Sequence, residues 1–334
     1  MNKHSLLRIV SAGFLLTGIC FGQTAESPSP TTAPNASSPA ANASPFPPVD
    51  SSNFTATLPT KETVDAFLKA QLGFDSNRIW QVNAIRNTIA KGFSEVTVIV
   101  AEKGTSDKPQ GFHLLITPDQ KFAIQDATLV PFGANPFADA RAILEKRADG
   151  PSRGAKANDL LIVEFSDMEC PHCKAAEPVM QNLLRDYPMA RVVYQNFPLS
   201  RIHPWSHKAA AYGVCVAQQG NDLFFKFLSN VFAGQEQTTE SNVDEMMKSA
   251  TTKAGADADK AAACAVTPAA LAKVDASVAL ADELAVAATP TLYVNGRAIT
   301  MGPNLTYELL QQIVNYQAQL DGLKLPPTMT TLPK

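Results

Sequence analysis

The chain lacks an excess of charge of either sign, and it has only five cysteines. Lys and Arg total 28 against 31 Asp and Glu, which gives a formal net charge of -3 over 334 residues. Such a balance offers no basic face to a phosphate backbone, so nucleic acid is excluded as the expected partner. The hydrophobic content of 45% is too high for a fully disordered chain. A chain of this length predicts about two domains, each able to bury a core.

The chain begins with an apolar stretch that is too short to span a membrane. Residues 9–21 follow Lys3 and Arg8, and the stretch falls short of the roughly 20 residues that a spanning helix needs. We therefore interpret 1–23 as a cleaved secretory signal peptide, with an uncleaved anchor as the less favoured alternative. The protein is expected to be periplasmic or otherwise extracytoplasmic in a bacterium. An odd cysteine count needs an explanation in an exported protein, and here Cys20 leaves with the signal.

Composition divides the remaining chain into segments. Residues 24–57 are rich in Pro, Ser and Ala and are predicted to be a disordered linker. Residues 58–134 predict a small α+β domain, 135–157 a linker helix over Ala138–Arg147 with a domain boundary at 149–154, and 158–325 a second domain. In the first of these domains, Thr60 is the expected N-cap of a helix that ends near Gly73. Four antiparallel strands are expected after it, at 79–89, 95–100, 112–117 and 121–129.

The chemically informative motif is Cys170-Pro171-His172-Cys173, which directly follows an apolar strand predicted at 160–165. With Pro171 at the first helical position, Cys170 is the N-cap, where its sulfur can accept hydrogen bonds from the amides of His172 or Cys173. The positive helix end and a protonated His172 would lower the pKa of Cys170 and make it the nucleophile. Cys173, one turn inside the helix, would be more buried and would resolve a mixed disulfide.

A Cys-x-x-Cys pair can also bind zinc or attach haem. A structural zinc site needs two further ligands, for which His203 and His207 are candidates, but an exported strand-turn-helix context favours redox use. Covalent haem attachment is excluded because Lys174 stands where the haem motif requires His. No metal and no cofactor is expected.

Cys170-Pro171-His172-Cys173, together with Thr289-Pro290 before the strand predicted at 292–294, resembles the thioredoxin superfamily, and the Pro-His dipeptide resembles its DsbA-like branch. The resemblance implies an α/β thioredoxin fold with an inserted helical domain at 203–286. It implies a cis Pro290 that faces the active-site cysteines and, with Thr289, holds substrate backbone. It also implies that Glu164 is a buried acid that assists proton transfer to Cys173.

Two more features follow from the same resemblance. Cys215 and Cys264 both fall in the inserted segment, where some DsbA-like branches carry a second disulfide; two inert buried thiols are the alternative. The segment 58–134 resembles the cystatin-like N-terminal domain that dimerises the DsbC and DsbG disulfide isomerases. A homodimer is therefore one expectation for this chain.

The resemblance implies an exported thiol:disulfide oxidoreductase that forms or exchanges disulfides in secreted proteins. A dimeric disulfide isomerase or reductase is the alternative enzyme, and a metal-binding or chaperone module is the alternative without turnover. The expected partners are unfolded or partly folded secreted proteins and a membrane redox protein similar to DsbB, VKOR or DsbD.

Overall fold

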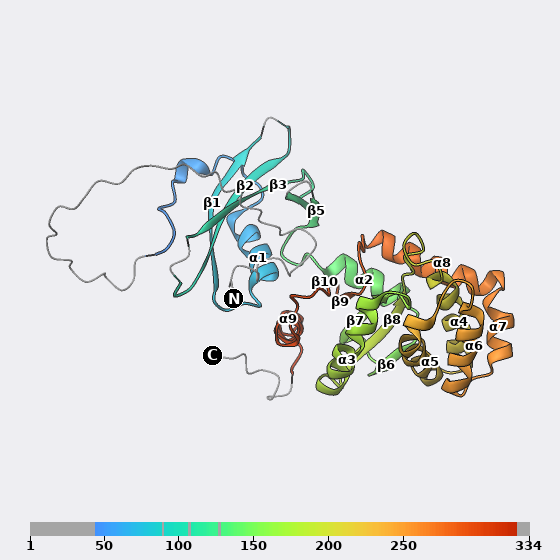
Figure 1. Cartoon of the computed structure of the whole chain (residues 1–334). Coiled ribbons are helices and arrows are strands. Elements are labelled where there is room, and N and C mark those ends of the chain that lie inside the picture. Colours follow the sequence, from blue (N-terminus) through green and yellow to red (C-terminus); the bar gives the residue numbers. More distant parts are fainter. Residues whose placement is uncertain (1–43, 89, 106–107, 126–127, 326–334) are drawn as a thin grey trace, which may run out of the picture. The chain divides into compact units, whose positions relative to one another are not determined.

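The structure is a computed structural model that describes residues 44–88, 90–105, 108–125 and 128–325 (Figure 1). The predicted signal peptide, 1–23, and the first part of the predicted linker, 24–43, lie outside the described residues. The described chain divides into two compact units, one ending at Pro136 and the other beginning at Phe137.

The N-terminal unit is one helix packed on an antiparallel sheet. The sheet has the order β1-β2-β3-β4-β5, so every strand pairs with its neighbour in sequence. The elements are η2 (Ser51–Asn53), α1 (Lys61–Leu72), β1 (Arg78–Asn87), β2 (Ser94–Glu102), β3 (Gln110–Ile116), β4 (Phe122–Gln125) and β5 (Thr128–Pro131).

The helix α1 forms where the sequence predicted it. The Thr60 side chain accepts a hydrogen bond from the amide of Thr63 at 3.2 Å, and Gly73 follows the last helical residue. Phe67 and Leu68 on one face of α1 are fully buried. They pack on side chains that alternate inward along the strands, including Val96 and Val98 of β2 with none of their surface exposed.

One strand prediction was wrong. The segment 121–129 was expected to be a single strand, but it contributes to two strands, β4 and β5. Gln125 pairs with Thr128 in antiparallel register, so the chain reverses direction between them. The apolar pattern runs on through both arms of this hairpin, and for that reason it did not reveal the turn.

The C-terminal unit is a mixed α/β structure around the sheet β10-β9-β7-β8-β6. The strands β7 and β8 are parallel, while β6, β9 and β10 pair antiparallel with their neighbours. The strands are β6 (Ser152–Gly154), β7 (Leu160–Ser166), β8 (Ala190–Asn196), β9 (Thr291–Val294) and β10 (Arg297–Thr300). The helices outside the insertion are α2 (Ala138–Arg147), α3 (Pro171–Asp186) and α9 (Tyr307–Leu320).

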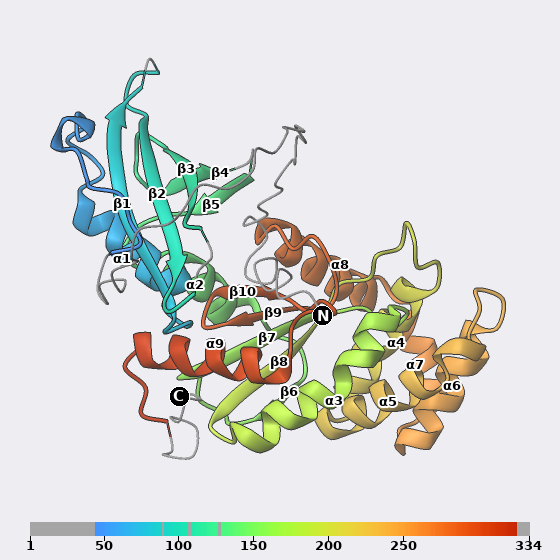
Figure 2. The same ribbon diagram turned by 60° about the vertical axis from the view of Figure 1, so that its left-hand side comes forward.

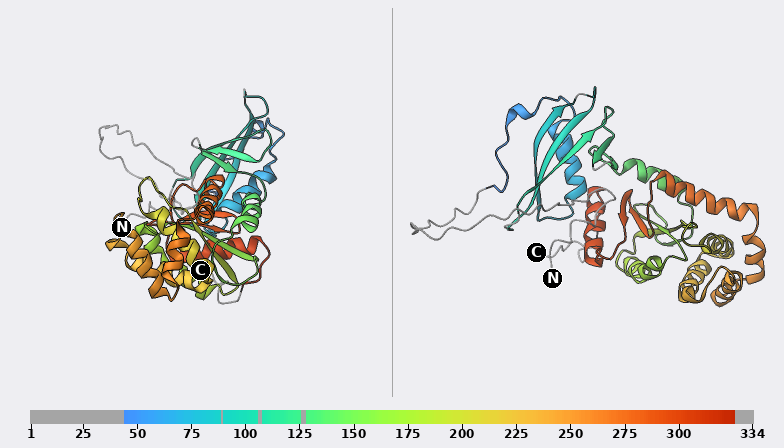
Figure 3. Two further views of the ribbon diagram at one scale, coloured as in Figure 1. Left: turned by 90° about the vertical axis from the view of Figure 1, so that its right-hand side faces the viewer. Right: turned by 45° about the horizontal axis from the view of Figure 1, so that its top comes forward.

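The sheet is covered on both faces, as Figures 2 and 3 show. Every residue of the central strand β7 is buried, which explains why the strand is apolar except for Glu164 and Ser166. Helix α2 packs on one face, where Leu144 contacts the cluster that contains Val163 and Phe165 of β7. On the other face α3 and α9 adjoin, since the Tyr187 hydroxyl donates to the side-chain oxygen of Asn315 at 2.7 Å.

The expected linker at 135–157 is also corrected. Helix α2 has the predicted bounds, but it is part of the C-terminal unit, which begins at Phe137 and not after a boundary at 149–154. The Phe137 ring lies 4.2 Å from the guanidinium of the fully buried Arg297. Residues after α2 form the edge strand β6, paired with β8. Helix α2 packs on the sheet and β6 is a strand of the sheet, so neither of them is a linker.

The helical insertion between β8 and β9 has its own core. Its elements are α4 (Ser206–Gln219), α5 (Asn221–Ala233), η3 (Gln235–Gln237), α6 (Val243–Ala254), α7 (Ala258–Ala265) and α8 (Pro268–Glu283). Phe224 and Phe227 of α5 are fully buried in this core, which extends to Cys170 and Cys173. Within the described ranges, no single helix is long and apolar enough to cross a membrane. Only α7 and α8 taken together, which are bent by 71° at their junction, reach that length and apolarity.

Candidate active site

The strand-turn-helix around the two cysteines is built as the motif predicts. Strand β7 ends at Ser166, Cys170 is the N-cap of α3, and Pro171 occupies the first helical turn. Pro171 lacks an amide hydrogen, which costs nothing at a position whose amide has no partner within the helix. Both cysteines are free thiols, so the structure is the dithiol form, and their exposed fractions are 4% for Cys170 and 1% for Cys173.

The surroundings of Cys170 favour its thiolate. Its pKa is lowered to about 5, first through a hydrogen bond with the Cys173 side chain, while burial acts in the opposite direction. Thr289 contributes next, followed by the backbone amides of Cys173 and His172. The sequence predicted the low pKa of Cys170 and the contribution of these amides, but the capping hydrogen bond that it predicted is absent, since the Cys170 side chain makes none to the start of α3. It also predicted a contribution from the imidazole, but His172 acts on Cys170 through its backbone, and its side chain is exposed.

Cys173 has the opposite electrostatic environment. Burial raises the pKa of Cys173 well above its usual range, and the neighbouring Cys170 raises it further. The Asp167 amide donates to the Cys173 sulfur at 3.3 Å. Because Cys173 lies inside the first turn of α3, its sulfur faces the end of β7 and not the solvent. One thiol is thus ready to react as an anion, while the other holds its proton.

The loop before β9 brings Thr289 and Pro290 to the cysteines. The Cys170 thiol is 3.6 Å from the carbonyl oxygen of Thr289, to which it donates, and the Thr289–Pro290 peptide bond is cis. Asn295 and Gly296 then turn the chain into β10, both with positive φ. Residues 119 positions apart therefore meet at the reactive sulfur.

Glu164 is buried in the middle of β7, with 2% of its surface exposed. Burial raises the pKa of Glu164 to about 7, and the charge of Glu177 adds to this, whereas Arg153 and the Ser166 hydroxyl oppose it. Glu177 and Arg153 pair with each other at 3.2 Å. A carboxyl with this pKa can both take and give a proton at neutral pH.

Several polar residues of the site were not found from the sequence. Asp167, 1% exposed, accepts from the amide of Leu199 at 2.8 Å and is paired with His203 at 2.7 Å. Glu169 accepts from the amide of Trp205 at 2.7 Å. These acids fasten the turn before Cys170 to the loop before α4. The signal in the sequence was the presence of two acids within the six residues after Glu164. Acidic side chains are unexpected in a turn beside a buried thiol unless they have hydrogen-bond partners.

A second connection comes from the helical insertion. The buried Gln235 side chain donates to the carbonyl oxygens of Met168 and Cys170, at 2.9 and 3.1 Å. Lys174, directly after the second cysteine, is paired with Glu236 at 2.9 Å. The insertion thereby holds the backbone of the reactive turn, although nothing in the local sequence around Gln235 indicates this contact.

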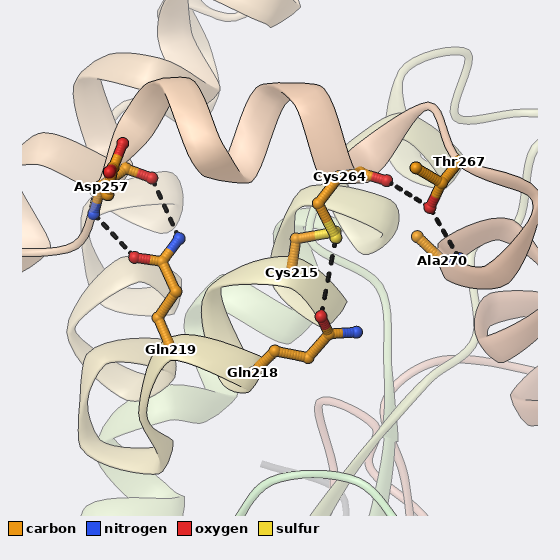
Figure 4. Close-up of a disulfide and its surroundings, with 7 residues drawn as sticks. All are labelled: Cys215, Gln218, Gln219, Asp257, Cys264, Thr267 and Ala270. Carbon is orange, nitrogen blue, oxygen red and sulfur yellow. Dashed lines mark hydrogen bonds between the residues drawn. A yellow bond between two sulfur atoms is a disulfide. The ribbon is translucent and has the colours of Figure 1, made fainter.

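Cys215 and Cys264 form a disulfide between α4 and α7 (Figure 4). The Cα atoms are 5.8 Å apart and the cysteines are separated by 49 positions in the chain. One turn away, the Gln219 side chain exchanges two hydrogen bonds with the backbone of Asp257 at the start of α7, at 2.8 and 3.0 Å. Both ends of α7 are thus tied to α4, at a distance from Cys170 along the insertion.

The two histidines weighed as zinc ligands have other partners. His203 pairs with Asp167, and His207 lies 3.4 Å from Asp275. Among the described residues, no group of three His, Cys, Asp or Glu side chains is arranged to hold a metal ion.

A thioredoxin family model matches residues 146–316, just over half of the chain. Two curated relatives are Na+/H+ antiporters: NhaA 3 of Salinispora tropica, 30% identical over 145 residues, and NhaA 1 of Salinispora arenicola, 28% identical over 154 residues. Each match covers 43% of this chain, and the chain spans only 21% of the length of either antiporter.

Solved structures with a similar arrangement have low sequence identity to this chain. The catalytic domain of Proteus mirabilis ScsC is 22% identical, with 55% of this chain and 99% of that chain covered and a TM-score of 0.45. A thioredoxin-like oxidoreductase from Silicibacter pomeroyi is 24% identical, with coverage of 54% and 98% and a TM-score of 0.46. BdbD from Bacillus subtilis is 19% identical, with coverage of 51% and 93% and a TM-score of 0.46.

Proposed function

Because the chain belongs to the thioredoxin family, we propose that it is an exported, DsbA-like thiol:disulfide oxidoreductase that forms or exchanges disulfides in secreted proteins. The observation that carries the proposal is the contrast between two thiols three residues apart. The pKa of Cys170 is lowered to about 5, whereas burial raises the pKa of Cys173 well above its usual range. A thiolate nucleophile beside a protonated, buried thiol is the arrangement that dithiol exchange requires.

The reaction proceeds through one mixed disulfide. In the disulfide form, a substrate thiolate attacks the sulfur of Cys170, a new bond joins the two sulfurs, and Cys173 leaves as a thiolate that takes up a proton. A second substrate thiolate then attacks the substrate sulfur of the mixed disulfide and expels the Cys170 thiolate. The substrate is oxidised and the enzyme is reduced by two electrons. A stable Cys170 thiolate is a good leaving group, which favours oxidation of the substrate.

The substrates are proposed to be unfolded or partly folded secreted proteins, because buried cysteines of folded proteins cannot reach Cys170. Thr289 and Pro290 adjoin the reactive sulfur and would contact substrate backbone beside it. A membrane redox partner similar to DsbB or VKOR would reoxidise the dithiol. No cofactor enters this proposal, since sulfur carries the electrons throughout.

An extracytoplasmic location has two supports. Residues 1–23 have the pattern of a secretory signal. Independently, the Cys215–Cys264 disulfide belongs to a compartment where disulfides persist. Mass spectrometry of the mature protein would test both, by its first residue and by the oxidation state of this pair.

A redox titration of the Cys170–Cys173 pair against glutathione tests the activity. We expect a potential nearer that of the strong oxidant DsbA, about -120 mV, than the values below about -300 mV typical of structural disulfides. A low potential together with no oxidation of a reduced substrate protein would contradict the proposal. Cys170→Ser should abolish turnover, and the double variant Cys215→Ala and Cys264→Ala is the matched control that retains it.

The folded N-terminal unit keeps a dimeric isomerase or reductase as a second candidate. This α+β unit has its own core, and the thiol exchange reaction at Cys170 and Cys173 does not require it. Recovery of scrambled ribonuclease by the whole protein would be compared with recovery by a version that begins at Phe137, where the C-terminal unit starts. Higher isomerase activity and a dimeric mass for the whole protein alone would favour this candidate, whereas equal activities would remove it.

A further inference from the structure

Three polar side chains of β7 and β8 share one buried face behind the cysteines. Glu164 and Ser166 are two residues apart on β7, so both point to the same side of the sheet. Tyr194 of β8 is the register partner of Glu164 and belongs to the same core cluster as Cys173. The exposed fractions are 2%, 1% and 1% for Glu164, Ser166 and Tyr194.

The hydroxyl groups of Ser166 and Tyr194 are buried without a settled partner. Neither oxygen makes a hydrogen bond of ordinary geometry with any residue that the structure describes. A buried hydroxyl without a fixed partner is costly, and such groups in native structures call for an explanation. Ser166 directly precedes Asp167, whose amide donates to the Cys173 sulfur at 3.3 Å, and Tyr194 belongs to the same buried cluster as Cys173.

The Ser166 hydroxyl acts on three ionisable groups. It is close enough to lower the pKa of Glu164, of Cys173 and of Tyr194. A serine hydroxyl can donate one hydrogen bond and accept two, and it rotates to suit its partners. A hydroxyl that reaches both a thiol and a carboxyl, and is bound firmly to neither, has the freedom that proton transfer needs.

We infer that Ser166, which shares a buried face with Glu164 and Tyr194, carries the proton between the Cys173 thiol and the Glu164 carboxyl. When Cys173 resolves a mixed disulfide, its thiol proton passes to the Ser166 oxygen while the Ser166 hydroxyl proton passes to Glu164. The Cys173 thiolate then bonds to the Cys170 sulfur and expels the other thiolate. In the opposite direction Cys173 leaves as a thiolate and the proton returns by the same route. Tyr194 is a positioning residue that donates to whichever oxygen is charged.

The charged groups around this relay set its pH range. Glu177 of α3 and Arg153 of β6 face Glu164 with opposite effects on its pKa, and both remain partly exposed. Cys170 faces Cys173. Asp167 faces Tyr194 and is itself paired with His203. The relay therefore joins the buried thiol to a carboxyl whose charged neighbours reach the solvent.

The inference rests on the proposed function, and the test separates the two. The reduced protein is mixed with oxidised glutathione and quenched with acid at successive times, and the mixed disulfide and the internal disulfide are counted by mass. The first step reports attack by Cys170 and the second reports resolution by Cys173. A wild-type protein that forms no mixed disulfide would overturn both the proposed function and this inference.

With the wild-type protein reacting, Ser166→Ala should slow the second step at neutral pH by about a hundredfold or more, the low end for loss of a proton-transfer group. The pH dependence of that step should move to higher pH, while the first step keeps its rate. Ser166→Thr, which retains a hydroxyl, should restore most of the rate. Tyr194→Phe should slow resolution by about threefold, and it remains informative if Ser166→Ala folds poorly.

Matched controls remove buried hydroxyls elsewhere. Ser277→Ala removes a hydroxyl that is hydrogen-bonded to the Gln195 side chain at 2.8 Å, and Tyr187→Phe removes the phenol that contacts Asn315. Both should leave the second step unchanged. Residues of one relay are not additive, so Glu164→Gln combined with Ser166→Ala should be no slower than Glu164→Gln alone. A Ser166→Ala rate and pH profile equal to those of Ser277→Ala, or additive slowing in the double variant, would overturn the inference.

Discussion

The Cys170 thiolate should lose stability when its strongest donor is removed. The Cys173 side chain makes the largest contribution to the low pKa of Cys170. A hydrogen bond to a charged group contributes about 1.5 to 3 kcal/mol, which converts to about one to two pH units in the titration midpoint. We expect Cys173→Ala to raise the midpoint of Cys170 from about 5 by that amount. Cys173→Ser keeps a donor and should raise it less. The ultraviolet absorbance of the thiolate, followed against pH, measures all three proteins.

The same low pKa predicts how stability depends on pH. The pKa of Cys170 in the folded dithiol form lies below its usual value of 9.0, so its contribution is complete above about pH 9 and is lost as the pH falls through about 5. At about pH 7 most of the Cys170 thiol is ionised, so the lowered pKa stabilises the dithiol form. Groups that titrate alike in the dithiol and disulfide forms cancel when the two are compared. Urea unfolding of both forms at several pH values should therefore show the dithiol form gaining on the disulfide form between about pH 5 and 7. A thiolate midpoint near the usual value of 9.0 would refute this reasoning.

Three further predictions concern stability. Replacing Cys215 and Cys264 by Ala opens a loop of 49 positions and should lower the free energy of unfolding by about 4 kcal/mol, measured with urea; an unchanged midpoint would contradict the cross-link. Gly296→Ala should cost more than about 2 kcal/mol in the same assay, because φ is +89° there and a Cβ would lie 2.2 Å from a backbone oxygen at the start of α2. A chain that begins at Phe137 should unfold cooperatively, whereas one that begins at Asn158 lacks α2 and should be less stable by more than about 3 kcal/mol. Equal stability of these two chains would restore the view of α2 as a linker.

The sequence was sufficient where a few neighbouring residues decide the structure. Thr60 capped the first helix as expected, and Cys170 with Pro171 began α3 as expected. The Asn-Gly dipeptide at 295–296 forms the hairpin turn between β9 and β10, as its tolerance of positive φ favours. In each case the determinant is local, such as a side-chain cap, a missing amide hydrogen or a tolerated positive φ.

Features that depend on distant contacts were missed. The bounds of α2 were predictable, but its place in the C-terminal unit depends on Arg297, which is buried against Phe137. The contact of Gln235 with the turn before Cys170 depends on how the insertion folds back over 65 positions. Periodicity reports which residues are buried and leaves open what they are buried against.

The pKa values of the two cysteines move in opposite directions although both thiols are buried. Burial raises the pKa of both and is the largest influence on Cys173, so the lowered pKa of Cys170 comes from its hydrogen-bond donors. At the N-cap, the amides at the start of α3 and the Cys173 thiol stabilise Cys170 as a thiolate. Cys173 has fewer hydrogen-bond donors around its sulfur, and the charge of Cys170 opposes its ionisation. An exchange reaction must therefore move a proton at Cys173 and not at Cys170, and we propose that Glu164, with a pKa of about 7, accepts it.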